Sequence, residues 1–328
     1  MIGYYVHHHG SGHLHRARAI AAELGEPVTL LTSLPDPGTG FADTVLLPRD
    51  DSGTDPAGTD AGGALHWVPR GDRGLADRMA AIAAWIAAAR PSAMVVDVSV
   101  EVALLARLHG VPVATMVLPG ERVDDPHRLV HRIADRVIAA WPRELNDPPY
   151  LRAHDVRFVG GISRFAGRPR VPDPRAPDVL VLAGTGGADF AAETVSELAV
   201  RHGDRRWRHL GPGSWVDDPW PLLCGAGVVV AHCGQGAVAD IAAAGARAVL
   251  VPAARPFGEQ HATAAALDAA GLAVIAEHWP APEHWPDLLD RAAELDPGRW
   301  TAWRTTGAAA RAATAIAELT GRRERRAS

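Results

Sequence analysis

One stretch of the sequence joins a glycine turn to polar side chains that could bind a phosphorylated ligand. The turn follows a short apolar run at 228–231, typical of a buried parallel strand, and precedes a helix-forming run at 237–244. Its residues with possible chemical roles are His232, Gly234, Gln235 and Gly236. Glycine lets the backbone approach a ligand closely, and the unpaired N–H groups at the start of a helix attract anions. The pattern therefore predicts an anion site, suited to phosphate, at the start of this helix.

Asp240 follows Gly236 by four residues, which places it on the same face of the predicted helix, about 6 Å farther along the axis. A carboxylate in that place could accept both ribose hydroxyls of a nucleotide whose diphosphate binds at the turn. The alternative interpretation is a first-turn aspartate that only stabilises the helix dipole. Glu259 and Gln260, after the next predicted strand, are further polar candidates.

Apolar runs predict a first strand at 2–6 and a second at 28–32. A histidine-rich stretch at 7–15 follows the first strand, and it contains five histidines around a Gly-Ser-Gly turn. A helix is predicted from about Leu14 to Leu24. An imidazole has an ordinary pKa of about 6.5, so it can act as a general base near pH 7. His13, directly after the turn, is the preferred candidate base, and His9 and His15 are lesser ones. The alternative is that His13 only caps or packs the start of the helix.

Together, these stretches resemble the sequence signature of GT-B glycosyltransferases, and most closely that of the UDP-glycosyltransferases and MurG-like transferases. The donor pattern of that family is H-x-G-x-x-(S/T/A)-x-x-(E/D), then G-x-P-x-x-x-x-P, then (D/E)-Q-x-x-N-A. It is filled in order by His232-Cys233-Gly234-Gln235-Gly236, Asp240, Pro252 and Glu259-Gln260. Three positions depart from it: Asp240 replaces the usual Glu, Ala246-Arg247 replaces Val-Pro or Lys-Pro, and Thr263 replaces Asn.

The resemblance implies an α/β fold of the GT-B type, with two Rossmann-like domains facing a cleft and a C-terminal helix crossing back to the first domain. We expect an acceptor-binding domain at 1–160, a linker at 161–177, a nucleotide-sugar-binding domain at 178–320 and a basic tail at 321–328. The linker is also indicated by its proline- and arginine-rich composition. Residues 300–319 are predicted to be helical.

The resemblance also implies roles for single residues. His13 would take a proton from the acceptor hydroxyl, and Asp97, after a strand predicted at 93–96, would orient it. An ordinary helix cap is the alternative for Asp97. The residues expected to border the acceptor are His9, Ser11, Gly12 and Glu121. Those expected to bind the donor are Arg164, Gly184, Thr185, Gly186, Trp215, Val216, His232, Gly234, Gln235, Gly236, Asp240, Glu259 and Gln260.

Composition narrows the function classes. The 328 residues suffice for two domains with cores, and a net charge of −5 gives no reason to expect nucleic acid or an anionic membrane as a partner. All 33 basic residues are arginine, which excludes a lysine Schiff base and a Walker A lysine. Two cysteines in this setting predict neither a disulfide framework nor a metal site. With no signal peptide and no membrane-length apolar run, we expect a cytoplasmic enzyme without a cofactor.

These observations favour an inverting, metal-independent glycosyltransferase. It would move a sugar from a nucleotide-sugar donor, for which a UDP-sugar is expected, to a small acceptor such as a natural product, a nucleobase or a lipid-linked sugar. No D-x-D motif is present, so a metal-bridged diphosphate is not expected. Two alternatives stay open: a GT-B sugar-nucleotide epimerase and a non-catalytic nucleotide-sugar binding protein. The sequence leaves open the acceptor, the sugar, the choice between UDP and TDP, the oligomeric state and which histidine of the stretch 7–15 is the base.

Overall fold

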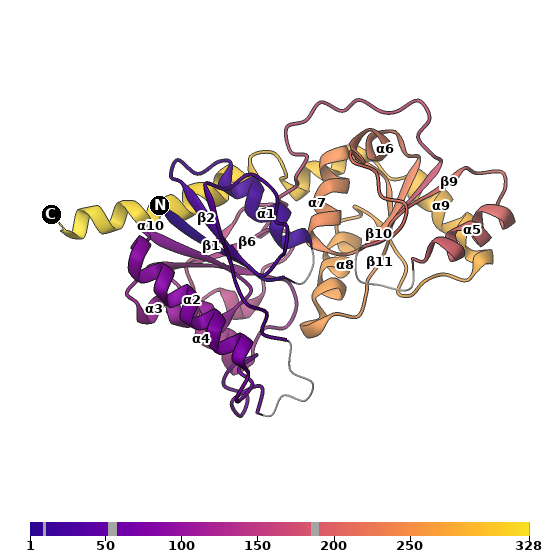
Figure 1. Ribbon diagram of the computed structural model, residues 1–328. Helices are drawn as coiled ribbons and strands as arrows, with labels where there is room; N and C mark the ends of the chain where they lie inside the picture. Colours follow the sequence, from indigo (N-terminus) through magenta and orange to yellow (C-terminus); the bar gives the residue numbers. More distant parts are fainter. Residues whose placement is uncertain (9–10, 52–57, 185–189, 328) are drawn as a thin grey trace.

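The computed structural model describes residues 1–8, 11–51, 58–184 and 190–327, which form two parallel sheets covered by helices (Figure 1). The first sheet has the strand order β3-β2-β1-β4-β5-β6-β7. Its strands are β1 Ile2–Val6, β2 Val28–Thr32, β3 Asp43–Leu46, β4 Ala93–Asp97, β5 Val113–Val117, β6 Arg136–Ala139 and β7 Val156–Phe158. Its helices are α1 Ser11–Ala21, α2 Arg73–Ala89, α3 Val100–Leu108 and α4 Asp125–Ile133, with a short 3₁₀ turn at Pro149–Leu151.

The second sheet has the order β12-β11-β10-β8-β9. Its strands are β8 Val179–Leu182, β9 Trp207–Leu210, β10 Val228–His232, β11 Ala248–Val251 and β12 Val274–Ile275. Its helices are α5 Ala192–Arg201, α6 Trp220–Gly225, α7 Gln235–Ala244, α8 Glu259–Ala269 and α9 Trp285–Ala293, with 3₁₀ turns at Pro256–Gly258, Pro282–His284 and Pro297–Trp303. Residues 159–178 connect the two sheets.

Both faces of the first sheet are buried, and β1, β4 and β5 are buried along their whole length, with mostly apolar side chains. One face packs against α2 and α3, where Ile82 and Val102 join the core. The other packs against α1 and against the last helix, α10 Ala308–Ala327, through Ala312 and Ile316. Figure 1 shows α10, in yellow, lying along the first domain. The end of the chain therefore completes the first core, which confirms the predicted C-terminal helix that crosses back to the first domain.

The helix predicted at 300–319 is wrong as a single element. A 3₁₀ turn ends at Trp303, Arg304 has φ of 54° and Gly307 has φ of 70°, and only then does α10 begin. The break separates two burial environments, because Trp300 and Trp303 pack in the second domain while α10 packs on the first. Helix α1 also begins earlier than predicted, at Ser11 rather than Leu14.

No helix in the described part of the chain is long and apolar enough to cross a membrane.

Candidate active site

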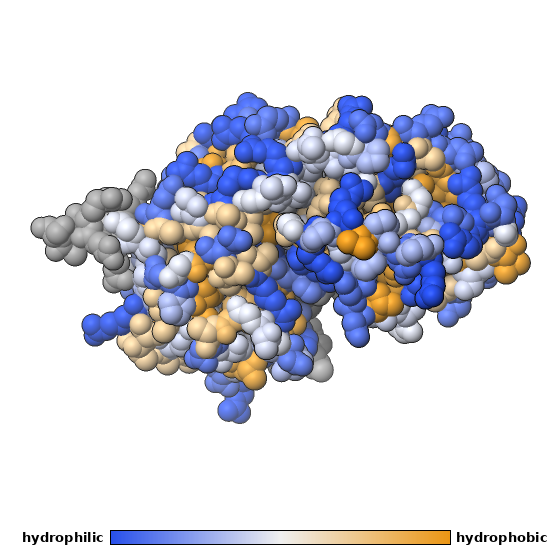
Figure 2. All heavy atoms as spheres, turned by 90° about the horizontal axis from the view of Figure 1, so that it is seen from above, coloured by the Kyte–Doolittle hydropathy of each residue, from blue (hydrophilic) through white to orange (hydrophobic). Residues whose placement is uncertain are grey.

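The starts of α1 and α7, from opposite domains, face one another. Each helix follows the carboxyl end of a parallel strand, the edge at which α/β sheets bind their ligands. A Cβ atom added to Gly236 would lie 3.9 Å from the Cα atom of Gly12, so the two turns approach closely. The predicted acceptor-side turn and the predicted donor-side turn therefore meet. Figure 2 shows the two lobes of the molecule with a notch between them.

His13 and Asp97 are in contact, as their predicted roles require. Asp97 ends β4 and is fully buried, and its Oδ1 lies 3.0 Å from Nδ1 of His13. The next residue, Val98, has φ of 69°, which β-branched residues rarely adopt. This sharp turn separates Asp97 from Ser99, whose hydroxyl caps α3 by accepting the N–H of Val102. Such strain is often found at functional sites.

Arg16 binds the same carboxylate of Asp97, and the sequence did not predict this contact. Its Nη2 donates to Oδ1 of Asp97 at 2.6 Å and its Nε to Oδ2 at 3.1 Å. Burial alone would raise the pKa of Asp97, but the charges of Arg16 and His13 lower it to about 2. Asp97 is therefore an anion at neutral pH. The only local signal for Arg16 is its place three residues after His13, on the same helix face.

The contact with Asp97 orients the imidazole of His13, and we assign the proton to Nδ1, although Nη2 of Arg16 lies equally close to this atom. Donation by Nδ1–H to the buried carboxylate of Asp97 leaves Nε2 as the hydrogen-bond acceptor, and the side chain keeps 21% of its surface exposed. This is the arrangement of an oriented general base. His15 points elsewhere, toward Nη1 of Arg164 at 3.3 Å, and burial followed by the charge of Arg164 lowers its pKa to about 4. His9 lies outside the described residues.

Predicted donor residues of the second domain form hydrogen bonds around the glycine turn before α7. His232 ends β10, its Nδ1 donates to the carbonyl of Val251 at 2.9 Å, and its ring stacks on Phe190. Gln260 is buried, and its Oε1 accepts the N–H of Ala253 at 2.9 Å. Helix α7 starts at Gln235, with Gly234 as its N-cap, two residues earlier than predicted. Its first N–H groups are therefore oriented toward the opposite domain.

Asp240 and Arg164 bond to each other. Oδ2 of Asp240 accepts Nε of Arg164 at 3.0 Å, and Oδ1 accepts the hydroxyl of Ser163 at 2.7 Å. Burial raises the pKa of Asp240, although Arg164 and Ser163 oppose the rise. Both carboxylate oxygens thus already bind the linker. The predicted ribose contact of Asp240 and diphosphate contact of Arg164 would compete with this bond, and both stay predictions.

The remaining predicted residues are spread along the same edge. Thr185 and Gly186 lie outside the described residues, which Gly184 borders. Trp215 is 52% exposed and so is accessible for stacking, whereas Val216 packs against the second core. The predicted acceptor residue Glu121 contributes its backbone N–H, which donates to the carbonyl of Phe257 at 2.8 Å.

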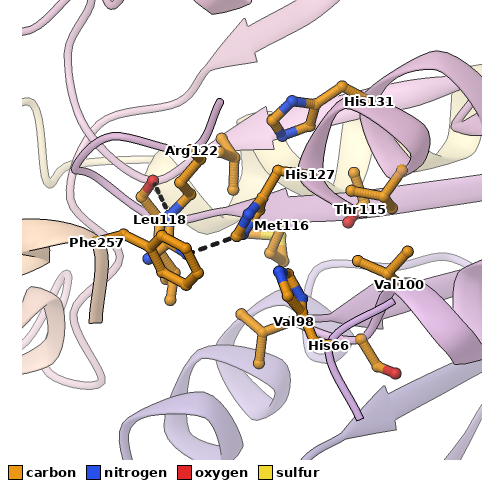
Figure 3. Close-up of a pocket in the computed structure, with 13 residues that line it drawn as sticks. His66, Val98, Val100, Thr115, Met116, Leu118, Arg122, His127, His131 and Phe257 are labelled. Carbon is orange, nitrogen blue, oxygen red and sulfur yellow. Dashed lines mark hydrogen bonds between the residues drawn. The ribbon is translucent and has the colours of Figure 1, made fainter. Parts of the chain in front are cut away.

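The first domain and Phe257 of the second enclose a pocket of about 140 Å³ at the carboxyl ends of β4 and β5. It is lined by His66, Val98, Ser99, Val100, Thr115, Met116, Val117, Leu118, Arg122, His127, Val130, His131 and Phe257. Figure 3 shows Phe257 reaching from the second domain toward Arg122 and His127. Gly120 makes this approach possible, because a Cβ atom there would lie 2.2 Å from the carbonyl oxygen of Phe257.

The polar loop at 120–127, which the sequence suggests borders the acceptor site without assigning it a role, supplies the polar side of this pocket. Arg122 donates from Nη1 to Nε2 of His127 at 3.0 Å and from Nη2 to Glu259 of the second domain at 3.4 Å. Burial lowers the pKa values of His127 and His131 to about 4, so both are neutral near pH 7. Arg122 and His127 are only five residues apart, but their spacing matches no motif that would assign them a role.

Two groups of side chains have potential metal-ligand atoms within 4.8 Å of one another in the described part of the chain. They are His7–His8–Asp50 and His66–Asp124–His127. Arg78 already donates to Asp50 at 2.7 Å, and Arg122 to Nε2 of His127. The latter bond places the proton of His127 on Nδ1, toward Asp124, where a metal would need a lone pair. These contacts favour a hydrogen-bond network over a metal site.

No protein-family model matches this chain. A UDP-N-acetylglucosamine–N-acetylmuramyl-(pentapeptide) pyrophosphoryl-undecaprenol N-acetylglucosamine transferase of Sorangium cellulosum is 30% identical over 257 residues, which are 66% of this chain and 62% of the relative. The match thus spans less than two thirds of that relative.

Solved structures cover nearly the whole chain. The glycotransferase of kitacinnamycin superposes with a TM-score of 0.70 at 18% identity, over 97% of this chain and 98% of the other. MurG of Acinetobacter baumannii gives a TM-score of 0.65 at 17% identity, over 97% of this chain and 99% of the other. The chain has the GT-B fold of these glycosyltransferases, as its glycine turns predicted.

Proposed function

We propose that the protein is an inverting, metal-independent glycosyltransferase that uses a UDP-linked sugar and a small acceptor with a hydroxyl group. One observation carries the proposal: the His13–Asp97 pair of the first domain lies at the start of α7, which bears the donor signature of the second. A base oriented by a carboxylate and a helix start suited to diphosphate are the two parts that such a reaction needs.

In the proposed mechanism, Nε2 of His13 takes the proton of the acceptor hydroxyl while Asp97 holds Nδ1–H and stabilises the imidazolium that forms. The hydroxyl oxygen bonds to the anomeric carbon as the bond to the diphosphate oxygen breaks on the opposite face, so the configuration inverts. The N–H groups and dipole of α7 stabilise the negative charge on the departing diphosphate. The proton ends on His13, and the diphosphate leaves as UDP.

The choice of donor and acceptor has separate support. The name of the Sorangium relative specifies a UDP-sugar donor and a lipid-linked acceptor for that protein, which favours UDP over TDP here. The pocket of about 140 Å³ supports a small acceptor, or a small head group of a larger one. Glu259 and Gln260 would orient the sugar at the edge of this pocket.

The test is a screen of UDP- and TDP-sugars, first for binding and then for turnover with small hydroxyl-containing acceptors. Binding of UDP should raise the melting temperature by mass action. Product formation with inverted configuration, seen by NMR, would support the proposal. Conversion of the UDP-sugar to an epimer without acceptor would instead indicate an epimerase. Binding without any turnover across the acceptor panel would indicate a binding protein.

A further inference from the structure

Arg16 lies between the predicted base and the donor turn. Its Nε and Nη2 bind Asp97, and its Nη1 donates to Oε1 of Gln235, the first residue of α7, at 2.7 Å. Its side chain is 7% exposed. One arginine therefore contacts a carboxylate of the first domain and an amide of the second, and its guanidinium has enough donors for both.

We propose that Arg16 is a positioning residue that offsets the charge of Asp97 beside the imidazole of His13 and fixes the base relative to the donor turn. This inference rests on the proposed function, because it assigns Arg16 a task in that reaction. It takes nothing from the family signature, in which the position of Arg16 has no part.

The electrostatic half of the proposal follows from the charges around His13. A buried anion beside a histidine favours the protonated imidazole, which cannot accept a proton. Arg16 places a cation on the same carboxylate, with Nη2 only 3.0 Å from Nδ1 of His13. The opposite charges of Arg16 and Asp97 therefore nearly cancel at the position of the imidazole. Asp97 can therefore orient the ring while Arg16 offsets its charge.

Other ionisable groups near the pair do not replace Arg16. Tyr4 of β1 lies beside Asp97 and Arg16, and burial first, then the charge of Asp97, raises its pKa, so it stays neutral. Glu259 acts on Arg16 from the second domain with a smaller effect than Asp97 does. Arg164 faces His15, which is two residues after His13 and on another face of α1, and not His13. Among these groups, Arg16 is the cation that hydrogen-bonds the carboxylate partner of His13.

Gln235 links Arg16 to the donor turn. Its side chain belongs to the turn whose N–H groups would bind the diphosphate, so its position is tied to that of the donor. A bond from Gln235 to Arg16, and from Arg16 to Asp97, links that turn to the base through three side chains. A shift between the domains would stretch the first of these bonds. The link thus fixes the distance between the proton acceptor and the anomeric carbon.

The test measures the titration of His13 directly, by NMR of the histidine side chains, with its signal assigned by loss in His13→Gln. In Arg16→Met the midpoint should move to higher pH by about 1–2 units, because Asp97 loses its cation. Arg16→Lys keeps the charge and should restore most of the original midpoint. Arg18→Met, on the same helix but bound to the carbonyl of Pro37, is the matched control and should not move it.

The link to the donor turn is tested by Gln235→Leu. It should leave the midpoint of His13 unchanged and lower kcat about 10-fold, the effect of losing one hydrogen bond to a charged group. An unmoved midpoint in a folded Arg16→Met protein would overturn the electrostatic half. An unchanged kcat in Gln235→Leu would overturn the link, and reduced UDP affinity alone would assign Gln235 to donor binding only. Because the NMR midpoint needs no turnover, a moved midpoint without glycosyl transfer would count against the proposed function alone.

Discussion

The substitution Asp97→Asn separates the charge of this carboxylate from its shape. Asparagine can still accept Nδ1–H of His13, so the orientation of the ring is retained. The change removes the anion and leaves the guanidinium of Arg16 uncompensated, 3.0 Å from Nδ1. A cation in that place opposes protonation of the imidazole. The acid limb of the pH profile of kcat should therefore move to lower pH, opposite to its shift in Arg16→Met.

The size of the shift can be bounded from the geometry. Two unit charges about 4 Å apart interact by about 4 kcal/mol at an effective dielectric constant of about 20, which equals about 3 pH units. His13 is 21% exposed, so solvent screens part of this energy. We expect a shift of about 1–2 units. The maximal rate should also fall by about 10–100-fold, since a less basic imidazole accepts a proton less readily in the transition state.

The assay is a pH–rate profile of glycosyl transfer with saturating UDP-sugar. Asp97→Asn leaves a buried arginine without its partner, which should lower the free energy of unfolding by about 3–5 kcal/mol. The profile is therefore recorded at low temperature, where circular dichroism confirms the fold. The double variant Arg16→Met/Asp97→Asn removes both charges and should return the limb close to its original pH. A limb that stays in place in Asp97→Asn would refute the argument and favour the assignment in which Nδ1 accepts a hydrogen bond from Arg16.

Three further predictions concern the base, the donor and the metal. His13→Ala should leave UDP binding intact and lower turnover by about 10²–10⁴-fold, measured as UDP release, and near-normal turnover would move the role to another histidine or to an acceptor that needs no base. Asp240→Asn should lower the free energy of unfolding by about 1.5–3 kcal/mol in urea titration, because Arg164 loses its charged partner. If Asp240 also binds ribose, the same variant loses most of the UDP-induced rise in melting temperature, and unchanged UDP affinity would exclude that role. Turnover should survive EDTA, whereas loss that magnesium or manganese restores would show that a cation holds the diphosphate.

Local patterns predicted most of the fold because they report local physics. The strands at Ile2–Val6 and Val28–Thr32 have the predicted bounds, since each is a β-branched or apolar run buried on both faces. The glycine turn before α7 is also present, although the helix begins two residues earlier than predicted. The break at Arg304 could not be predicted, because arginine carries no preference for the left-handed region. The chain must bend there, because Trp300 and Trp303 pack in the second domain while α10 packs on the first.

The candidate site was predicted only where its residues belong to a sequence motif. His13 and Asp97 were paired through the family resemblance, and their contact is present in the structure. Arg16 was missed because its carboxylate partner lies 81 residues away. Arg122 was missed for the same reason, since its partner Glu259 is 137 residues away in the other domain. Long-range ion pairs leave no periodicity in a sequence, so only the fold reveals them.

Arginines of the first domain and linker already bind the polar residues through which the second domain would contact a donor. Arg16 bonds Gln235, Arg122 bonds Glu259, and Arg164 bonds Asp240. Leaving such groups buried without a partner would cost several kcal/mol each when charged. Under the proposed function, donor binding is therefore an exchange of hydrogen-bond partners. The affinity for the donor then depends on how readily each arginine releases its residue, and Arg122, whose bond of 3.4 Å is the longest of the three, should release first.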